Sequence, residues 1–317
     1  MSVTASVEID QRIIAAIRAI ESGIGSVLLG KPAQVRMATA ALISGEHLLL
    51  NDLPGVGKTS LGTALARVVD GVFGRIQGTP DLLPTDVTGS SIFNQTDGLW
   101  VFRPGPLMAN VVLVDELNRI TPRSQSALLE AMAEGSVTVD GVTRPVPVPF
   151  MVVATMNPTG SAGTFPLTIG QLDRFGAALG LGSVDRETER LLLRGGGGVQ
   201  AADQLKSVLP ADLMPELRTV VARVHLAEPL VDYVLDICDA LRPAGHLSTR
   251  AAQSMVTWAQ ALALLDGRSF VVPDDLKTLA VPCLAHRLAG EGERIDAHHI
   301  SVRSAVEELN VPDRPAS

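Results

Sequence analysis

Cysteine and lysine are both scarce in this sequence of 317 residues. The two cysteines, Cys238 and Cys283, are isolated and fit no CxxC spacing, which excludes a disulfide framework and a cysteine-rich zinc site and indicates a reducing compartment. Only four of the 26 basic residues are lysines. A lysine within a glycine-rich loop therefore stands out, and Lys58 is such a residue.

The sequence also lacks the features of secreted, membrane-spanning and strongly basic proteins. No long apolar run follows the N-terminal methionine, so we expect no cleaved secretion signal and a cytoplasmic location. The formal net charge of −8 argues against a surface built to hold nucleic acid or an anionic membrane. Residues 145–172 are uncharged over a length that could cross a bilayer, but their five prolines predict a strand and loops, without membrane insertion.

Hydrophobic patterning divides the chain into two parts. Up to about residue 181, apolar segments at 46–50, 72–76, 111–114 and 150–155 alternate with helical patterns, which predicts a parallel sheet between helices. Beyond it the strand signals stop, and the remainder reads as helices beginning near Pro229, Ser248 and Pro273. We predict an α/β domain over residues 1–184, a helical domain over 185–309 and a tail over 310–317.

Two hairpins and one helix start are predicted within the first part. Asp140-Gly141 forms the tip of a hairpin over residues 136–148, because this pair accepts positive φ in a tight turn. A second hairpin over residues 90–102 is centred on residues 95–98. Thr121 and Pro122 suit the N-cap and first position of a helix that runs to about residue 133, with the threonine hydroxyl as the cap.

The strongest chemical signal is a phosphate-binding loop between a buried strand and a helix. Residues 51–60 read NDLPGVGKTS, in which glycines turn successive N–H groups toward one centre, Lys58 bridges β- and γ-phosphates and Thr59 binds Mg²⁺. The full pattern GxxxxGK[ST] has glycine where this chain has Asp52. The alternative is a glycine-rich turn with a solvated lysine.

Polar side chains end two further strands. Asp115 and Glu116 follow an apolar strand, where Asp115 is placed to hold Mg²⁺ and Glu116 to orient and deprotonate a water. Asn157 ends the next strand, where it can contact the γ-phosphate or that water. The alternative is that these residues merely open loops, since an asparagine before proline is an ordinary turn former.

These motifs and several longer blocks together resemble the MoxR family of AAA+ ATPases, in the helix-2-insert clade. The blocks are RIQGTPDLLPTDVTG from Arg75, FRPGPLMAN from Phe102, DELNR from Asp115, SALLEAMAE from Ser126, and QLDRF ending at Phe175. The similarity covers nearly the whole chain. It implies a P-loop AAA+ core with a five-stranded parallel sheet between helices, followed by a smaller all-helical lid.

The resemblance implies roles that spacing alone does not give. Arg174 matches the arginine finger that acts on the neighbouring subunit, and Arg250 matches the sensor 2 arginine of the lid; the alternative for each is a surface ion pair. With ATP and Mg²⁺ as cofactors, the implied nucleotide-binding residues are Gly55, Val56, Gly57, Lys58, Thr59, Ser60 and Arg250. The implied catalytic residues are Lys58, Glu116, Asn157 and Arg174, and the implied metal ligands are Thr59 and Asp115.

The resemblance also implies partners and a function. We expect a ring-shaped homo-oligomer, a hexamer, that remodels or matures client proteins, often ones with von Willebrand factor A domains. The alternative is a nucleotide-switched scaffold with little turnover, which Glu116 argues against and the unusual Met156 and Gly170 leave open. A DNA-acting motor is disfavoured by the acidic balance.

The two hairpins resemble the helix-2 and pre-sensor-1 inserts of this clade. Trp100 and Phe102 in the first hairpin could hold a client, but we expect both to pack in a local core. Because aromatic residues make up only 3% of the chain, brief remodelling of a docked client is favoured over threading through an aromatic pore.

Overall fold

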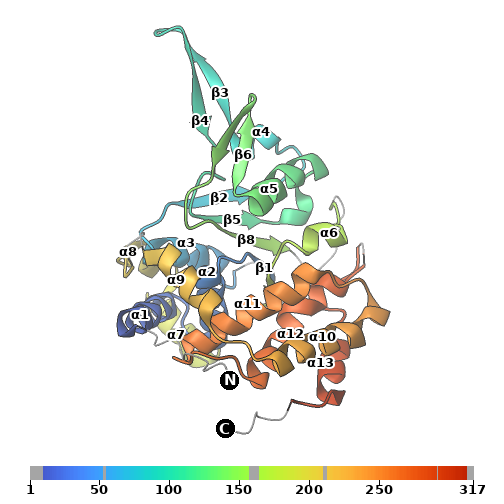
Figure 1. Ribbon diagram of the computed structural model, residues 1–317. Coiled ribbons are helices and arrows are strands. Elements are labelled where there is room, and N and C mark those ends of the chain that lie inside the picture. The colour runs from blue at the N-terminus through green and yellow to red at the C-terminus, as the bar shows by residue number, and fades with distance from the viewer. Residues whose placement is uncertain (1–9, 53–54, 157–163, 210–212, 291, 313–317) are drawn as a thin grey trace.

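The structure is a computed structural model that describes residues 10–52, 55–156, 164–209, 213–290 and 292–312. Its centre is a five-stranded parallel sheet in the order β2-β5-β8-β1-β9 (Figure 1). The strands are β1 (Leu48–Asn51), β2 (Phe73–Gln77), β5 (Val111–Asp115), β8 (Met151–Met156) and β9 (Ala177–Leu179). The predicted sheet is confirmed, and β9 is the one strand of this sheet that no apolar segment had located, since it is only three residues long.

Alternate residues of the strands point to opposite faces of this sheet, as the two-residue period of a strand requires. Leu48 and Leu50 pack on one face against α1 (Gln11–Val27), α2 (Pro32–Ser44) and α3 (Lys58–Val68). Leu49 packs on the other face, together with α5 (Pro122–Glu134). Both faces are covered, which is why the strands read as continuous apolar runs.

Two hairpins project beyond the sheet (Figure 1). β6 (Ser136–Val139) and β7 (Val142–Pro145) are joined by Asp140 and Gly141, with φ of 53° and 76°, so the predicted tight turn is confirmed. β3 (Gly89–Asn94) and β4 (Leu99–Pro104) form the second predicted hairpin, which follows the short helix α4 (Pro84–Thr88).

The expected local core around Trp100 is wrong. Its side chain is 71% exposed and contacts the ring of Phe93, because a two-stranded ribbon provides no further layer to cover its face. Phe102 is half-buried, with the Arg144 guanidinium of the other hairpin 4.1 Å from its ring centre.

Helices make up the chain beyond β9, and the predicted starts at Pro229, Ser248 and Pro273 are confirmed. Ser248 caps its helix by accepting a hydrogen bond from the N–H of Ala251. These helices are α7 (Arg186–Leu193), α8 (Gly198–Gln204), α9 (Leu213–Arg223), α10 (Glu228–Leu241), α11 (Thr249–Leu265), α12 (Pro273–Leu288) and α13 (His299–Glu308). α8 packs against α3 and α1, and α9 against α2 and α11. The division at residue 184 stays a prediction.

Three smaller expectations have clear outcomes. Thr121 precedes α5 but makes no capping bond, because its hydroxyl faces Ser124 Oγ at 3.4 Å instead of a backbone N–H. Cys238 and Cys283 are buried free thiols. Among the helices of the described residues, none is long and apolar enough to cross a membrane.

Candidate active site

The ends of three parallel strands bring the predicted site residues to one edge of the sheet. Asn51, the last residue of β1, lies opposite Met156, the last residue of β8, and Val114 of β5 lies opposite Ala154 of β8. The loop after β1 and the carboxylates after β5 therefore emerge at the same level. Asn157, which follows Met156 directly, lies outside the described residues.

The loop after β1 has the geometry of an anion site. Gly55 and Gly57 have φ of 87° and 104°, and a Cβ built on either would meet no atom of the described residues within 4 Å. Gly57 is the N-cap of α3 and brings no capping side chain, so the first N–H groups of that helix remain available to a ligand. These residues fit a polyphosphate: open space faces glycine backbone at a helix N-terminus.

Lys58 closes this loop. Its ammonium group donates a hydrogen bond to the carbonyl oxygen of Asp52 over 3.1 Å. Thr59 is half-buried and Ser60 is buried in the first turn of α3. An ammonium group that holds a neutral carbonyl can exchange this partner for the charged oxygen of a phosphate, a stronger acceptor.

Asp52, which departs from the standard loop pattern, anchors the loop to the far edge of the sheet. Its carboxylate accepts hydrogen bonds from the N–H groups of Leu181 and Gly182, just after β9. Lys31 supports the same junction: it is buried, and its ammonium group donates to the carbonyls of Val56, Leu181 and Gly182. Burial lowers the pKa of Lys31, and the charge of Asp52 opposes this shift. The sequence reasoning missed Lys31, although its place among only four lysines was a usable signal.

The two carboxylates after β5 each have an arginine partner. Asp115 accepts two hydrogen bonds from Arg75 of β2, at 2.7 and 3.0 Å. Glu116 pairs with Arg119 at 2.8 Å. Both arginines are about half exposed, so water screens the pairs and a ligand can displace them at modest cost.

The backbone at Glu116 is in the left-handed region, with φ of 55°, which is uncommon for a residue other than glycine. Its N–H group donates to the buried hydroxyl of Thr155 on β8 over 2.9 Å. Gly78 lies close by, because a Cβ at that position would come within 2.2 Å of the Glu116 carbonyl oxygen. The absence of a side chain at residue 78 therefore makes room for the conformation that directs Glu116.

Arg174 and Arg250 lie apart from this loop. Arg174 follows the short helix α6 (Ile169–Leu172), is half-buried and donates to the carbonyl of Gly170 over 2.6 Å. Arg250 is exposed in the first turn of α11. Within the described residues, no hydrogen bond or ion pair joins either arginine to the phosphate loop. The structure thus brings together the loop, Asp115 and Glu116, and leaves both arginines separate.

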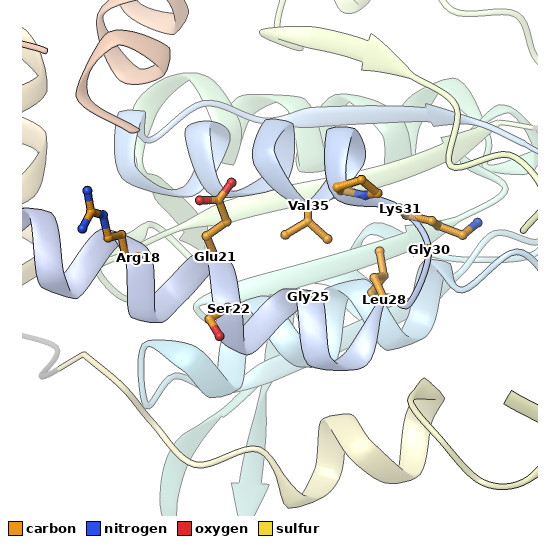
Figure 2. Close-up of a pocket in the computed structure, with 9 residues that line it drawn as sticks. Arg18, Glu21, Ser22, Gly25, Leu28, Gly30, Lys31 and Val35 are labelled. Carbon is orange, nitrogen blue, oxygen red and sulfur yellow. The ribbon is translucent and has the colours of Figure 1, made fainter. Parts of the chain in front are cut away.

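A cavity of about 450 Å³ lies between α1 and α2, beside the phosphate loop. Figure 2 shows Leu28 and Val35 pointing into the space between the two helices, with Arg18 and Glu21 farther along α1. Lys31 lines one end of the cavity, so its aliphatic chain borders this space while its ammonium group bonds to the loop. The lining residues belong to α1, α2 and the turn between them, and none belongs to the phosphate loop. The cavity therefore lies beside the candidate site and is not part of it.

The donor set determines which metal could bind. Among the described residues, no group of three histidine, cysteine, aspartate or glutamate side chains could hold a metal ion. Thr59 and Asp115 offer hard oxygen donors, which suit Mg²⁺ when phosphate oxygens and waters complete its shell. His47 and His286 are structural instead: burial lowers their pKa values to about 4 and about 3.

Two family models match this chain. The first, described as the ATPase family associated with various cellular activities (AAA), matches residues 47–177. The second, the AAA lid domain, matches residues 240–309. The first range spans the phosphate loop, the two carboxylates and Arg174, and the second contains Arg250.

Curated relatives and a solved structure agree with these matches. The chain is 42% identical to the uncharacterized protein YeaC of Bacillus subtilis, covering 91% of this chain and 92% of the relative. It is 37% identical to the chaperone MoxR1 of Mycobacterium tuberculosis, covering 83% and 72%. The crystal structure of a "putative ATPase" from Cytophaga hutchinsonii has a TM-score of 0.85 and 31% identity, covering 95% and 96%.

Proposed function

Because this chain belongs to the MoxR family of AAA+ ATPases, we propose that it hydrolyses ATP to ADP and phosphate with Mg²⁺ at the carboxyl edge of its sheet. The observation that carries this proposal is the loop whose glycines face open space, at the strand edge that also presents Asp115 and Glu116. Binding at this edge is the general rule for open parallel sheets.

The loop residues bind the phosphates. N–H groups of Gly55, Val56, Gly57 and Ser60 surround the phosphate oxygens, and Lys58 leaves the Asp52 carbonyl for the β- and γ-phosphates. Thr59 and Asp115 would hold Mg²⁺, for which Asp115 would have to release Arg75. When bound, Mg²⁺ supplies positive charge that neutralises the phosphate oxygens during transfer.

Glu116 acts on the attacking water. Its carboxylate leaves Arg119, orients the water in line with the γ-phosphate and accepts its proton. Asn157, which follows Met156 in the sequence, positions the same water. Strained backbone at a catalytic residue is consistent with this role, because such strain concentrates at functional sites.

The site is completed by a second copy of the chain. Arg174 reaches the γ-phosphate of the neighbouring subunit in a ring-shaped homo-oligomer, a hexamer, while Arg250 senses nucleotide in its own subunit. Within the described residues Arg174 donates to Gly170 and makes no hydrogen bond to its own phosphate loop, which is consistent with an arginine that acts in trans.

The ring uses hydrolysis to remodel or mature client proteins in the cytoplasm. Support comes from the relative named as a chaperone, MoxR1. Clients with von Willebrand factor A domains are the class we propose. The exposed Trp100 and Phe93 at the end of the β3–β4 hairpin offer apolar contact area for such a client.

Phosphate release measured on the purified chain tests the ATPase. The wild-type protein should release phosphate from ATP with Mg²⁺, and Lys58→Ala and Glu116→Gln should each lower the rate on the order of a hundredfold or more. Glu130→Gln, an exposed acid of α5, is the matched control and should leave the rate unchanged. If the wild-type rate never exceeds that of Glu116→Gln, with or without a client, the scaffold alternative replaces the enzyme.

Client binding is tested with the Glu116→Gln variant, which should hold ATP without turning it over. This variant should retain a purified von Willebrand factor A domain protein in ATP and release it in ADP. Equal retention in both nucleotides would contradict a nucleotide-driven cycle.

A further inference from the structure

The segment that carries Arg174 is held by two helices of the lid. Ser248, the N-cap of α11, donates its hydroxyl to the Asp173 carboxylate at 2.9 Å from each oxygen. Arg287 of α12 donates its Nε to the same carboxylate over 3.0 Å. Asp173 directly precedes Arg174, so two lid helices meet on the residue next to the proposed finger.

These bonds are buried and charge-assisted. The Arg287 side chain is 2% exposed and that of Asp173 is 17% exposed, so water screens their attraction far less than at a surface pair. Arg287 also donates to the carbonyls of Gly176 and Cys283. Each end of the connection is therefore fixed by more than one bond.

The residue on the other side of Arg174 is held as well. His286 of α12 donates its Nε2–H to the carbonyl of Phe175 over 3.0 Å, and burial lowers the histidine pKa to about 3, which keeps the ring neutral. Phe175 is fully buried. In contrast, the guanidinium of Arg174 donates to Gly170 at an exposed position. The chain on both sides of Arg174 thus belongs to the lid contact.

Ser248 connects this contact to the first turn of α11. Its hydroxyl oxygen also accepts the N–H of Ala251 over 3.2 Å, so the same group caps the helix and binds Asp173. Arg250 lies two residues after Ser248, in that same turn. Hydrogen bonds weaken steeply with distance and angle, so a rotation of α11 must either carry Asp173 with it or break the contact.

We propose that Asp173, Ser248 and Arg287, here called the Asp173 network, position Arg174 according to the state of the chain's own lid. Asp173 is a positioning residue: it acts through Arg174 and does not itself touch nucleotide. The inference rests on the proposed role of Arg174 toward the neighbouring subunit. It adds that the lid of one subunit affects hydrolysis in the next through these three side chains.

Mixed oligomers isolate the two functions of a subunit. In a mixture of Arg174→Ala with Glu116→Gln, hydrolysis occurs only where an Arg174→Ala subunit receives Arg174 from a Glu116→Gln neighbour. Adding Asp173→Asn to the Glu116→Gln subunit tests the network in the donor. Adding it to the Arg174→Ala subunit tests the network in the acceptor.

We expect the donor variant to lower phosphate release by about 5- to 150-fold, the usual size of a coupling between sites, and the acceptor variant to change it less than about threefold. Ser248→Ala in the donor should act in the same direction, and Ser248→Thr, which keeps the hydroxyl, should restore the rate. The matched control is Thr257→Ala, because among the described residues the Thr257 hydroxyl of α11 donates only to the Gln253 carbonyl of its own helix, over 3.0 Å.

The possible results separate the hypotheses. A donor variant that is as active as its parent would overturn the network, as would equal losses in donor and acceptor, which indicate a merely structural role. If Thr257→Ala in the donor costs as much as Ser248→Ala, any change in α11 suffices and the specific network is wrong. If the parent mixture shows no activity although mass measurement finds intact oligomers, the finger assignment fails, and the network fails with it.

Discussion

The carboxyl edge of the sheet and the junction between sheet and lid, where the Asp173 network lies, are held by opposite kinds of contact. At the edge, Gly55 and Gly57 face open space, and the arginine partners of the two carboxylates are about half exposed. At the junction, Arg287 is 2% exposed and bonds to four groups on three residues. A site that must accept and release a ligand needs weak, displaceable contacts, whereas a connection that transmits movement needs contacts that do not yield.

The largest expected effect concerns Arg174, which lies in the segment that the junction holds. Arg174→Ala should lower the rate of hydrolysis on the order of 10³- to 10⁵-fold, the effect of an arginine finger, because the proposed oligomer relies on this guanidinium to reach the γ-phosphate of the neighbouring site. Steady-state phosphate release at saturating ATP measures it, with binding of a fluorescent ATP analogue expected to be unchanged. Arg303→Ala, an exposed arginine of α13, is the control. A loss below about tenfold would show that the edge is complete in one subunit.

The next largest effect concerns the free energy of unfolding, which should depend more on the buried ion pair of the junction than on an exposed pair. Arg287→Ala removes one member of a buried ion pair and should lower the free energy of unfolding by about 3 kcal/mol. Arg294 offers a matched control, since its pair with Asp296 is exposed and Arg294→Ala should change stability by less than about 0.5 kcal/mol. Urea unfolding followed by circular dichroism compares them; equal losses would mean that the junction is no stronger than the surface.

Acid should weaken the core and the junction together. His47 accepts the N–H of Val152 at Nδ1 and His286 donates to Phe175, and burial lowers their folded pKa values to about 4 and about 3. Both folded pKa values lie below that of histidine in the unfolded chain, so the unfolded chain binds protons first as the solution is acidified. The contribution of each neutral histidine to the free energy of unfolding is therefore complete above about pH 6.5. It decreases by about 2 kcal/mol per histidine as the pH is lowered from 7 to 5. Urea midpoints across this range measure the slope, and His286→Gln should reduce it. An unchanged slope would mean that His286 is charged in the folded protein.

The smallest effect is expected at Trp100, with the buried Trp258 as the contrast. Trp100 is 71% exposed, so Trp100→Ser should change the free energy of unfolding by less than about 0.5 kcal/mol. Trp258 is fully buried in α11, and Trp258→Ala should cost about 3 to 5 kcal/mol. Thermal unfolding monitored by calorimetry measures both. A large loss for Trp100→Ser would place that residue in a core after all.

Much of the fold was predictable because the residues that build it act locally. Apolar segments located four strands, and Asp140-Gly141 identified its turn because few other pairs accept two positive φ angles. The phosphate loop was equally clear, since its glycines and Lys58 are consecutive in the sequence. Such features need no knowledge of distant neighbours.

The remainder depends on contacts between residues far apart in the sequence. Asp52 looked like a departure from a motif, and only the N–H groups of Leu181 and Gly182 explain its carboxylate. Arg287 lies 114 residues after Asp173, so no spacing rule connects them. Trp100 was misjudged for the same reason, because exposure depends on whether another layer covers the hairpin.

Hydrolysis at the open edge should require Arg174 from a second subunit. The dependence of turnover on oligomer assembly tests this requirement most directly. Phosphate release per subunit should be measured across a range of protein concentrations, with the mass of the oligomer recorded in the same samples. We predict that the rate per subunit rises steeply over the concentrations at which oligomers form, and that Arg174→Ala assembles equally well without this rise. Full turnover by monomers, at a rate independent of concentration, would contradict the account.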